Sequence, residues 1–284
     1  SEAKVLGVVE DPQGPALILD GTIFHPQGGG QPSDQGTITY GSGTMAVSIV
    51  RDVGGVIHHF GSISGLSAAP SSPSPPRPEP GQRAFLALDG AKRLRHAALH
   101  SAGHAVDKAV MEAVGAGVFL PLKGYHFDDS PYVEYRGALP QGLEKDAFVD
   151  KLNTELDKLA AADVETIVEV IDERKGAFTT SSKEAGEGPT GGREAGFRRT
   201  RSGGIAAAAA ARVGEEAAGA RSKYGAATRI VTVAGLSCPC GGTHVRSTRE
   251  LKGTRVTKVK AKKGTLRVSY TLAAPSASAR SPQS

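Results

Sequence analysis

The sequence has only two cysteines, a small net charge and no long apolar run among its 284 residues. A membrane-spanning helix needs about 18 consecutive apolar residues, and no segment reaches that length. The first residues also lack the basic and then apolar layout of a secretory signal, so we expect an intracellular, cytoplasmic protein. Hydrophobic residues make up 39% and charged residues 22% of the chain, as in soluble globular proteins.

The two cysteines, Cys238 and Cys240, flank a single proline, a spacing that is poor for a mutual disulfide. Two cysteines are also too few for the framework of a disulfide-rich secreted domain. We therefore expect reduced thiols that serve in metal binding or in chemistry.

The net charge of +5 is uninformative, but its distribution is uneven. Residues 246–267 contain nine basic residues and one acid, Glu250. A basic face of this kind suits a phosphate backbone. The alternative is a solvated strand edge protected by lysines.

A change of apolar spacing divides the chain into two predicted domains. From residue 4 to 60, short apolar runs alternate with turn residues, which predicts a small, barrel-like β domain. The Ser/Pro-rich residues 64–82 are expected to form a loop inserted in this barrel. Near Gly90 the spacing becomes helical, so we predict domains at 1–90 and 91–275.

The second domain mixes helices and strands. Residues 91–114 are alanine-rich with an apolar stripe at helical spacing, which predicts a long helix. Strand-like runs at 117–122 and 132–137 follow, then an amphipathic helix near 142–161 and a strand at 164–172. The predicted fold class is therefore α+β, with an N-terminal β-barrel followed by an α/β domain.

Two segments of unusual composition interrupt or follow this domain. Residues 174–226 have almost no bulky apolar residue, so we expect a mobile insertion with one short helix at 204–219. Alternating runs around a glycine predict a hairpin at 254–272. Residues 276–284 are expected to form a disordered tail.

His100 and His104 lie one turn apart on the predicted long helix, which places both imidazoles on one face within reach of one ion. His96 lies one turn earlier, so the pair is either 96 with 100 or 100 with 104. Helical rotation prevents all three from reaching one ion.

A second pair of candidate ligands, Cys240 and His244, follows a predicted strand in the segment "CGGTH". Gly241 and Gly242 allow a turn tight enough to direct both side chains to one centre. Cys238 is the alternative thiol, although it precedes the glycine turn. Three imidazoles and one thiolate form a tetrahedral set suited to Zn²⁺.

Four motifs resemble one known family. The segments "HPQGGGQPSDQG" at 25–36, "RLRHAALHSAGHAVDKAV" at 93–110, "KGYHFDDSPYVEY" at 123–135 and "CPCGGTHV" at 238–245 resemble alanyl-tRNA editing proteins of the AlaX type, relatives of the alanyl-tRNA synthetase editing domain. The resemblance implies that His100, His104, Cys240 and His244 bind zinc. It also implies that the second domain is the α/β sandwich of synthetase editing domains.

The resemblance implies that the glycine-rich segment shapes an amino-acid site. The corresponding residues are Gly28, Gly29, Gly30, Gln31, Asp34 and Gly36. The alternative is a tight turn between strands that requires positive φ angles.

The chemistry implied by the resemblance is hydrolysis of the ester that joins a wrong amino acid to tRNA-Ala. An alanine site discriminates weakly against glycine and serine, which differ from alanine by one methyl or one hydroxyl, so a second, hydrolytic site is needed. Zinc would either activate a water or position the substrate. We expect the protein to act in trans on Ser-tRNA-Ala or Gly-tRNA-Ala, because no adenylate-forming domain is evident.

Further candidate residues follow from these motifs. Substrate-binding candidates besides the glycine segment are Ser101, Gly124, Tyr125, His126 and Thr243. Ser101 has the alternative of bonding to its own helix, and Tyr125 of being core. The candidate contacts to the tRNA backbone are Arg93, Arg95, Arg246, Arg249, Lys252, Arg255, Lys258 and Lys260.

Two rival functions use the same residues. A non-catalytic RNA-binding protein stabilised by zinc would keep the four ligands and the basic run but would hydrolyse nothing. A zinc hydrolase for another ester or another tRNA is the third hypothesis.

Overall fold

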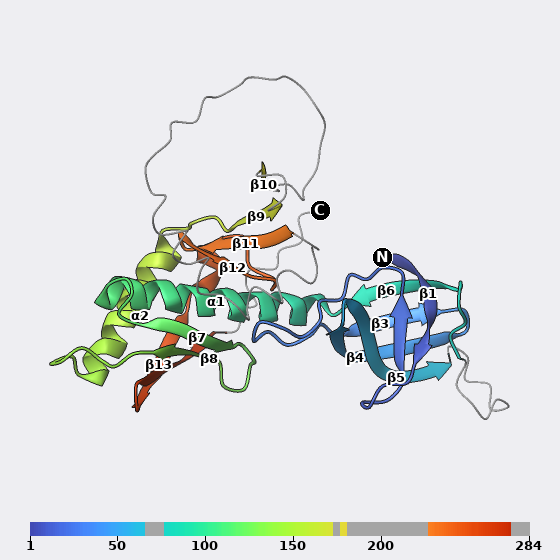
Figure 1. The fold of residues 1–284 in the computed structure, drawn as a ribbon, viewed down its shortest axis with the longest axis horizontal. Coiled ribbons are helices and arrows are strands. Elements are labelled where there is room, and N and C mark those ends of the chain that lie inside the picture. The colour runs from blue at the N-terminus through green and yellow to red at the C-terminus, as the bar shows by residue number, and fades with distance from the viewer. Residues whose placement is uncertain (66–76, 173–176, 181–226, 274–284) are drawn as a thin grey trace, which may run out of the picture.

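The computed structural model describes residues 1–65, 77–172, 177–180 and 227–273. It confirms the α+β class, with a β-barrel at the N-terminal end and two helices with further sheets after it (Figure 1). The predicted helix at 204–219 and the tail at 276–284 lie outside the described residues, as do most of the loop and the insertion. Within those residues no helix is long and apolar enough to cross a membrane.

Six antiparallel strands form a closed barrel in the order β1-β2-β5-β4-β3-β6. Its core consists of alternate, inward-facing side chains, as expected of strands with one buried face. Val5, Ile38 and Val50 are fully buried. The strands are β1 Glu2–Val9, β2 Ala16–Leu19, β3 Gly36–Tyr40, β4 Gly43–Val53, β5 Val56–Gly65 and β6 Arg83–Leu88.

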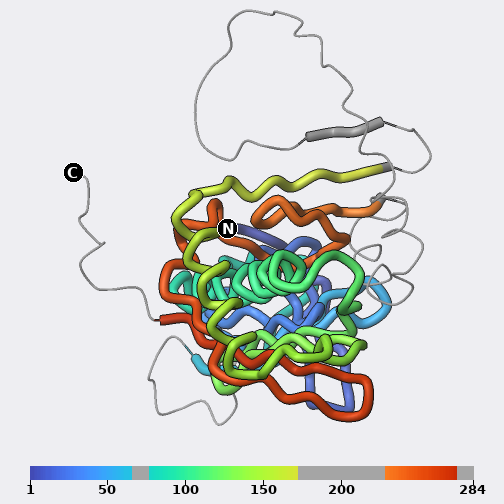
Figure 2. The backbone as a smooth tube through the Cα atoms, turned by 90° about the vertical axis from the view of Figure 1, so that its left-hand side faces the viewer, coloured from blue at the N-terminus to red at the C-terminus, as the bar shows by residue number. Residues whose placement is uncertain are grey.

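Helix α1, Gly90–Val114, confirms the predicted long helix and begins directly after the barrel. Its N-cap is Asp89, whose carboxylate accepts a hydrogen bond from the Lys92 N–H at 3.0 Å. The helix lies between the two sheets that follow the barrel in the chain, one on either side (Figures 1 and 2). Its buried positions are mostly alanine or similarly small residues, and a helix buried on several sides needs such residues to let both sheets approach.

In the described part of the chain, two four-stranded sheets, helix α2 and the short 3-10 helix η1, Thr248–Leu251, accompany α1. One sheet has the order β13-β14-β8-β7, and the other has the order β10-β9-β11-β12. Helix α2, Lys145–Ala161, buries Phe148, Leu152 and Leu156 in the core shared with α1 and the first sheet. The strands are β7 Leu120–Tyr125, β8 Tyr132–Arg136, β9 Ile167–Asp172, β10 Ala177–Thr180, β11 Ala227–Val233, β12 Leu236–Pro239, β13 Thr254–Lys262 and β14 Thr265–Leu272.

Two elements differ from the expectation. Strand β7 lies a few residues later than the predicted 117–122, because its register is fixed by pairing with β8. Residues 177–180, which fall in the expected insertion, form strand β10 and pair with β9. The predicted hairpin at 254–272 is confirmed, with Lys263 and Gly264 in the left-handed region at its turn.

A buried ion pair joins the barrel to helix α1. Asp34, 1% exposed, accepts hydrogen bonds from the Arg93 guanidinium, one of them at 2.7 Å, and from the backbone N–H of His25. Arg93 also donates to the carbonyl of Ile23 at 2.7 Å. One carboxylate therefore holds two barrel segments and the first turn of the helix together.

We expect Asp34→Ala to destabilise the chain by about 3 kcal/mol, because it leaves the partly buried guanidinium without its counter-charge. Denaturant unfolding measures this loss. The matched control is Glu2→Ala, which breaks the exposed pair with Arg83 and should leave the free energy of unfolding nearly unchanged. Equal effects of the two substitutions would show that the buried pair is not a structural joint.

Candidate metal centre and adjoining pocket

Four side chains from two distant segments converge on one point. His100, His104, Cys240 and His244 each offer one ligand atom, and these atoms all lie within 4.8 Å of one another. The two histidines come from the middle of α1, and the other two residues follow β12. The arrangement could hold a metal ion.

The distances from the Cys240 sulfur to two of the imidazoles fit a tetrahedral site. The Cys240 sulfur lies 3.5 Å from His100 Nε2 and 3.6 Å from His244 Nε2. Ligands at zinc–nitrogen and zinc–sulfur bond lengths lie about 3.3–3.8 Å apart in a tetrahedron. The Nε2 atom of His104 is buried without a hydrogen-bond partner among the described residues, as expected of a nitrogen that serves as a metal ligand.

Burial keeps the three imidazoles in the neutral form that binds metals. It lowers the pKa of His104 to about 4, and it lowers the pKa values of His100 and His244 well below the usual range, with the neighbouring imidazoles adding to the effect. At neutral pH each ring therefore carries a nitrogen lone pair.

The geometry also separates the alternative ligands. His96 is not among the clustered residues, so the helical pair is 100 with 104. Cys238 lies outside the cluster too: its sulfur is 3.6 Å from Nδ1 of His104, on the far side of that ring from Nε2. Asp107 lies 3.8 Å from the same Nδ1 atom.

Gln31 from the barrel fixes the orientation of His100. Its amide oxygen must accept from the backbone N–H of Thr243 at 2.9 Å, so its amide nitrogen donates to the Thr243 hydroxyl at 2.9 Å. The same oxygen lies 2.7 Å from His100 Nδ1, which must therefore carry the proton. This leaves Nε2 of His100 unprotonated and directed at the cluster, the arrangement that orients most metal-bound histidines.

The glycine-rich segment forms the predicted tight turn, and its predicted role in an amino-acid site stays a prediction. Gly28 and Gln31 exchange backbone hydrogen bonds of 3.2 and 2.9 Å, and Gly29 and Gly30 have φ angles of 56° and 75°. The turn places the fully buried Gln31 against the metal cluster. The glycines allow the backbone conformation of the turn. The side chain that reaches the cluster is the amide of Gln31, which follows them.

Close backbone contacts join α1 to the loop that carries His244. A Cβ atom at Gly242 would lie 2.1 Å from the His100 ring, so this glycine is needed for space rather than for its φ angle. Ser101, fully buried, accepts a hydrogen bond from the Val245 N–H at 3.1 Å instead of bonding to its own helix. Ser101 therefore fastens the loop to the helix.

His126 lies beside the cluster but does not join it. Its ring stacks on His100 with centroids 4.7 Å apart. Its Nδ1 atom donates to the Tyr270 hydroxyl at 2.7 Å, because that hydroxyl donates its own proton to the carbonyl of Leu99 at 2.9 Å. Burial lowers the pKa of His126 to about 3, so the ring is neutral with an unprotonated Nε2.

A pocket of about 340 Å³ adjoins the cluster between the barrel and the metal-binding loop. His244, one of the four clustered residues, forms part of its wall, so the cluster lies at the pocket surface. The remaining lining residues are Thr22, Ile23, Phe24, His25, Arg93, Arg229, Gly241, Gly242 and Thr243. The walls are mainly polar.

Sequence reasoning missed five residues of the pocket lining, Thr22, Ile23, Phe24, His25 and Arg229. Arg229 donates to the carbonyls of Cys240 and Gly242 at 2.6 and 3.0 Å, and so supports the loop from behind. The available signal was an arginine within the otherwise uncharged strand β11. Its partners could not be identified without the fold.

Gly124 and Tyr125 occupy opposite faces of β7. Gly124 faces inward, where a Cβ atom would lie 2.2 Å from His126 Nε2. Tyr125 points the other way by strand alternation and stacks on Tyr132, with ring centroids 5.4 Å apart. The Tyr125 side chain therefore points away from the cluster, and its role in the amino-acid pocket stays a prediction.

The eight residues predicted to contact the tRNA backbone fall into two groups. Four of them form ion pairs within the chain: Arg93 with Asp34, Arg95 with Asp128, Arg249 with Asp163 and Arg255 with Asp157. Arg246, Lys252, Lys258 and Lys260 are exposed on the surface. The second group therefore offers most of the charge that a phosphate backbone would meet.

Comparison with known proteins finds relatives among alanyl-tRNA editing proteins and alanine–tRNA ligases. The sequence model described as the threonyl and alanyl tRNA synthetase second additional domain matches residues 228–268, which include Cys240 and His244. The alanyl-tRNA editing protein AlaX-M of Methanosarcina barkeri is 26% identical over 285 residues, which cover 95% of this chain and 93% of that protein. The resemblance to AlaX-type editing proteins is confirmed.

Other relatives share a smaller part of their length. AlaX-L of Pyrococcus horikoshii is 23% identical over 88% of this chain and 49% of its own length. The alanine–tRNA ligase of Halorubrum lacusprofundi is 35% identical over 40% of this chain, which spans only 11% of the ligase. The chain thus covers about a tenth of such ligases and about half of AlaX-L.

We expect Cys240→Ala and His104→Ala to abolish stoichiometric metal binding, because each removes one of four ligands. Cys238→Ala is the matched control, since its sulfur lies outside the cluster, and this variant should keep one metal ion per chain. Elemental analysis of the purified variants measures the content. A full complement of metal in Cys240→Ala, with loss in Cys238→Ala, would reverse the assignment of the thiol.

Gln31→Met should weaken metal binding about 10–100-fold, because the apolar side chain no longer orients His100. Competition with a chromophoric chelator gives the affinity. Gln35→Met, in the same segment, removes an amide whose described hydrogen bonds are to Ser48 and Lys92 and should change the affinity little. Equal affinities of all three proteins would exclude the orienting role.

Proposed function

We propose that this chain is a zinc-dependent deacylase that hydrolyses the ester of mischarged tRNA-Ala, acting on its seryl or glycyl form. The observation that carries the proposal is the position of His244, which belongs both to the four-residue cluster and to the wall of the pocket. A substrate in the pocket would therefore lie directly beside a bound ion. The whole-length similarity to AlaX-M supports the same reaction.

The residues present suit zinc. Three neutral imidazoles and one thiolate are ligands that this borderline-soft ion prefers, and their spacing matches a tetrahedral shell. His100, His104, Cys240 and His244 would hold the ion, and Gln31 would orient the first of them. When bound, zinc supplies Lewis-acid chemistry for ester hydrolysis.

The chain's own residues bind and select the substrate. Thr243 accepts a hydrogen bond from Gln31, which leaves its hydroxyl proton to donate into the pocket. Polar walls of this kind suit the hydroxyl of serine, and they would be left partly unpaired by the methyl of alanine. Arg229 places a fixed positive charge at the pocket, where the negative charge of the terminal nucleotide would approach.

A second candidate is a non-catalytic RNA-binding protein in which zinc is structural. The observation that favours it is the complete set of four protein ligands, which is typical of structural zinc sites. The two functions share the ligands and the basic surface and differ only in turnover.

Deacylation of tRNA-Ala charged with serine, glycine or alanine decides between the two candidates. We expect release of serine or glycine at least about tenfold faster than release of alanine, with loss of the activity in His104→Ala. Tight binding of all three tRNAs without any release would establish the second candidate instead. Hydrolysis of all three at one rate would overturn the editing proposal.

A further inference from the structure

Among the described residues, the sheet β13-β14-β8-β7 packs on α1 and α2 with one face only. Val133, Leu266 and Val268 point into the core, and the alternate residues of the same strands point outward. We call the outward side the open face. Its residues lie in cross-strand rows that the register defines. One row is Lys260, Arg267, Glu134 and Lys123; the next is Lys258, Ser269, Tyr132 and Tyr125; the third includes Lys262, Thr265 and Arg136.

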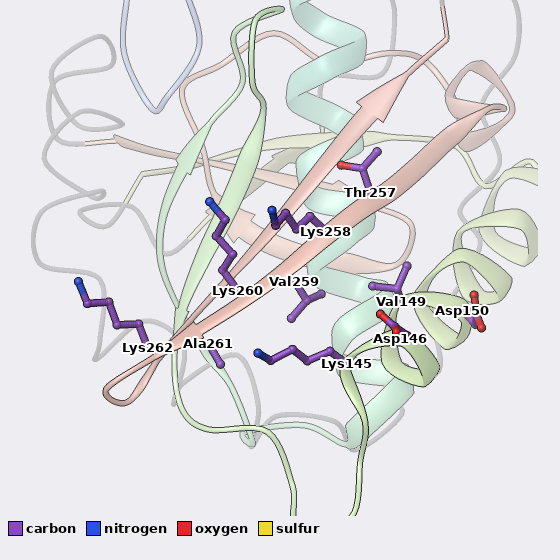
Figure 3. Close-up of a pocket in the computed structure, with 10 residues that line it drawn as sticks. All are labelled: Lys145, Asp146, Val149, Asp150, Thr257, Lys258, Val259, Lys260, Ala261 and Lys262. Carbon is purple, nitrogen blue, oxygen red and sulfur yellow. The ribbon is translucent and has the colours of Figure 1, made fainter.

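The open face is strongly cationic. Its three rows contain six basic side chains and one carboxylate, that of Glu134, which pairs with Arg267 at 3.0 Å. Figure 3 shows Lys258, Lys260 and Lys262 projecting to the same side of β13, while Val259 and Ala261 point the other way. Neighbouring strands lie about 4.8 Å apart, so these charges are dense.

The groove drawn in Figure 3 shares Lys258, Lys260 and Lys262 with the open face. It has a volume of about 760 Å³ between β13 and the start of α2. Its wall on α2 carries Asp146 and Asp150 beside Lys145. The one carboxylate of the open face, that of Glu134, is paired with Arg267, so a phosphate meets less repulsion on the open face than along the α2 wall of the groove.

A column of aromatic rings stands at the β7–β8 end of the open face. Phe127 stacks on Tyr125 with centroids 4.5 Å apart and planes 14° apart, and Tyr125 stacks on Tyr132 at 5.4 Å. The Arg267 guanidinium closes one end of the column, 4.0 Å from the Tyr132 centroid. At the other end, no described ring covers the outer side of Phe127.

Two consecutive residues, His126 and Phe127, link the aromatic column to the candidate metal centre. Phe127 follows His126 in the chain, and the His126 ring stacks on His100 of the cluster. The two neighbouring side chains point in opposite directions, one to the cluster and one to the column. His126 and Phe127 therefore connect the cluster, on the inner side of the sheet, with the aromatic column on the outer side.

We propose that the open face binds the unpaired end of the substrate RNA, with its phosphates on the lysine and arginine rows and one base stacked on Phe127. Basic sheet faces with aromatic side chains bind single-stranded RNA in this way, because every base has a π-face and every nucleotide a phosphate. The proposal rests on the proposed function for the identity of the RNA. The surface itself is defined by charge and stacking alone.

The test uses the full chain and two RNA hairpins, one with an unpaired 3′ end and one made blunt. Wild type should bind the first hairpin more tightly, and Phe127→Leu should weaken that binding about tenfold with little effect on the blunt hairpin. Phe85→Leu is the matched control, since Phe85 is an exposed aromatic on the barrel with Arg83 over its ring. Fluorescence anisotropy gives the affinities.

A second variant does not depend on the packing of an aromatic ring. Lys260→Ala should lower the slope of log affinity against log salt by about 0.7, the value for one lost single-strand phosphate contact. An unchanged slope together with wild-type binding by Phe127→Leu would overturn the proposal. Displacement of the RNA by polyglutamate at equal charge concentration would also overturn it, because the surface would then select charge alone.

Deacylation measured on the same proteins separates the two hypotheses. If wild type releases serine while Phe127→Leu binds both hairpins normally and Lys260→Ala keeps the wild-type salt slope, the open face is rejected and the editing function stands. If wild type releases no amino acid but Phe127→Leu loses its preference for the unpaired end, the surface stands and the editing function is rejected.

Discussion

The amide of Gln31 is the constraint on which the site depends. Its oxygen is shared between the Nδ1 proton of His100 and the backbone of Thr243, and its nitrogen holds the hydroxyl of Thr243. One side chain from the barrel thereby fixes a ligand on α1 and the loop that carries His244. Because the donors and acceptors of Thr243 permit only one orientation of the amide, the protonation of His100 is fixed as well. The packing of the barrel against α1 therefore also sets the geometry of the candidate metal site.

The interface between the barrel and α1 protects that arrangement. Asp34 and Arg93 form a buried pair that holds the first turn of the helix, two turns before His100. The carboxylate also binds the backbone of His25, which lies in the pocket wall. The barrel therefore contributes both the support of the metal centre and part of the surface that a substrate would meet.

Local patterns in the sequence were sufficient to predict the four clustered residues and helix α1. The i and i+4 spacing of His100 and His104 and the segment "CGGTH" predicted a cluster that the folded chain assembles. The helical stripe predicted α1 to within one residue. The choice between Cys238 and Cys240 followed from the same reasoning, and the cluster contains the preferred thiol.

Contacts between segments that are far apart in the chain could not be predicted from the sequence. The bond from Gln31 to Thr243 spans 212 positions, and no local spacing indicates it. The acidic partners of the predicted phosphate contacts likewise come from other elements. The direction of Tyr125 depends on the register between β7 and β8, since a shift by one residue would turn it to the opposite face.

Three glycines from three separate segments surround the ring of His126. A Cβ atom would lie 2.3 Å from the ring at Gly103, 2.2 Å at Gly124 and 3.2 Å at Gly30. The imidazole thus occupies volume that these residues leave vacant on α1, β7 and the barrel turn. The three glycines and His126 therefore fit together only when the barrel, the helix and the sheet are all in place. A displacement of any one of these elements would change the packing around the His126 ring.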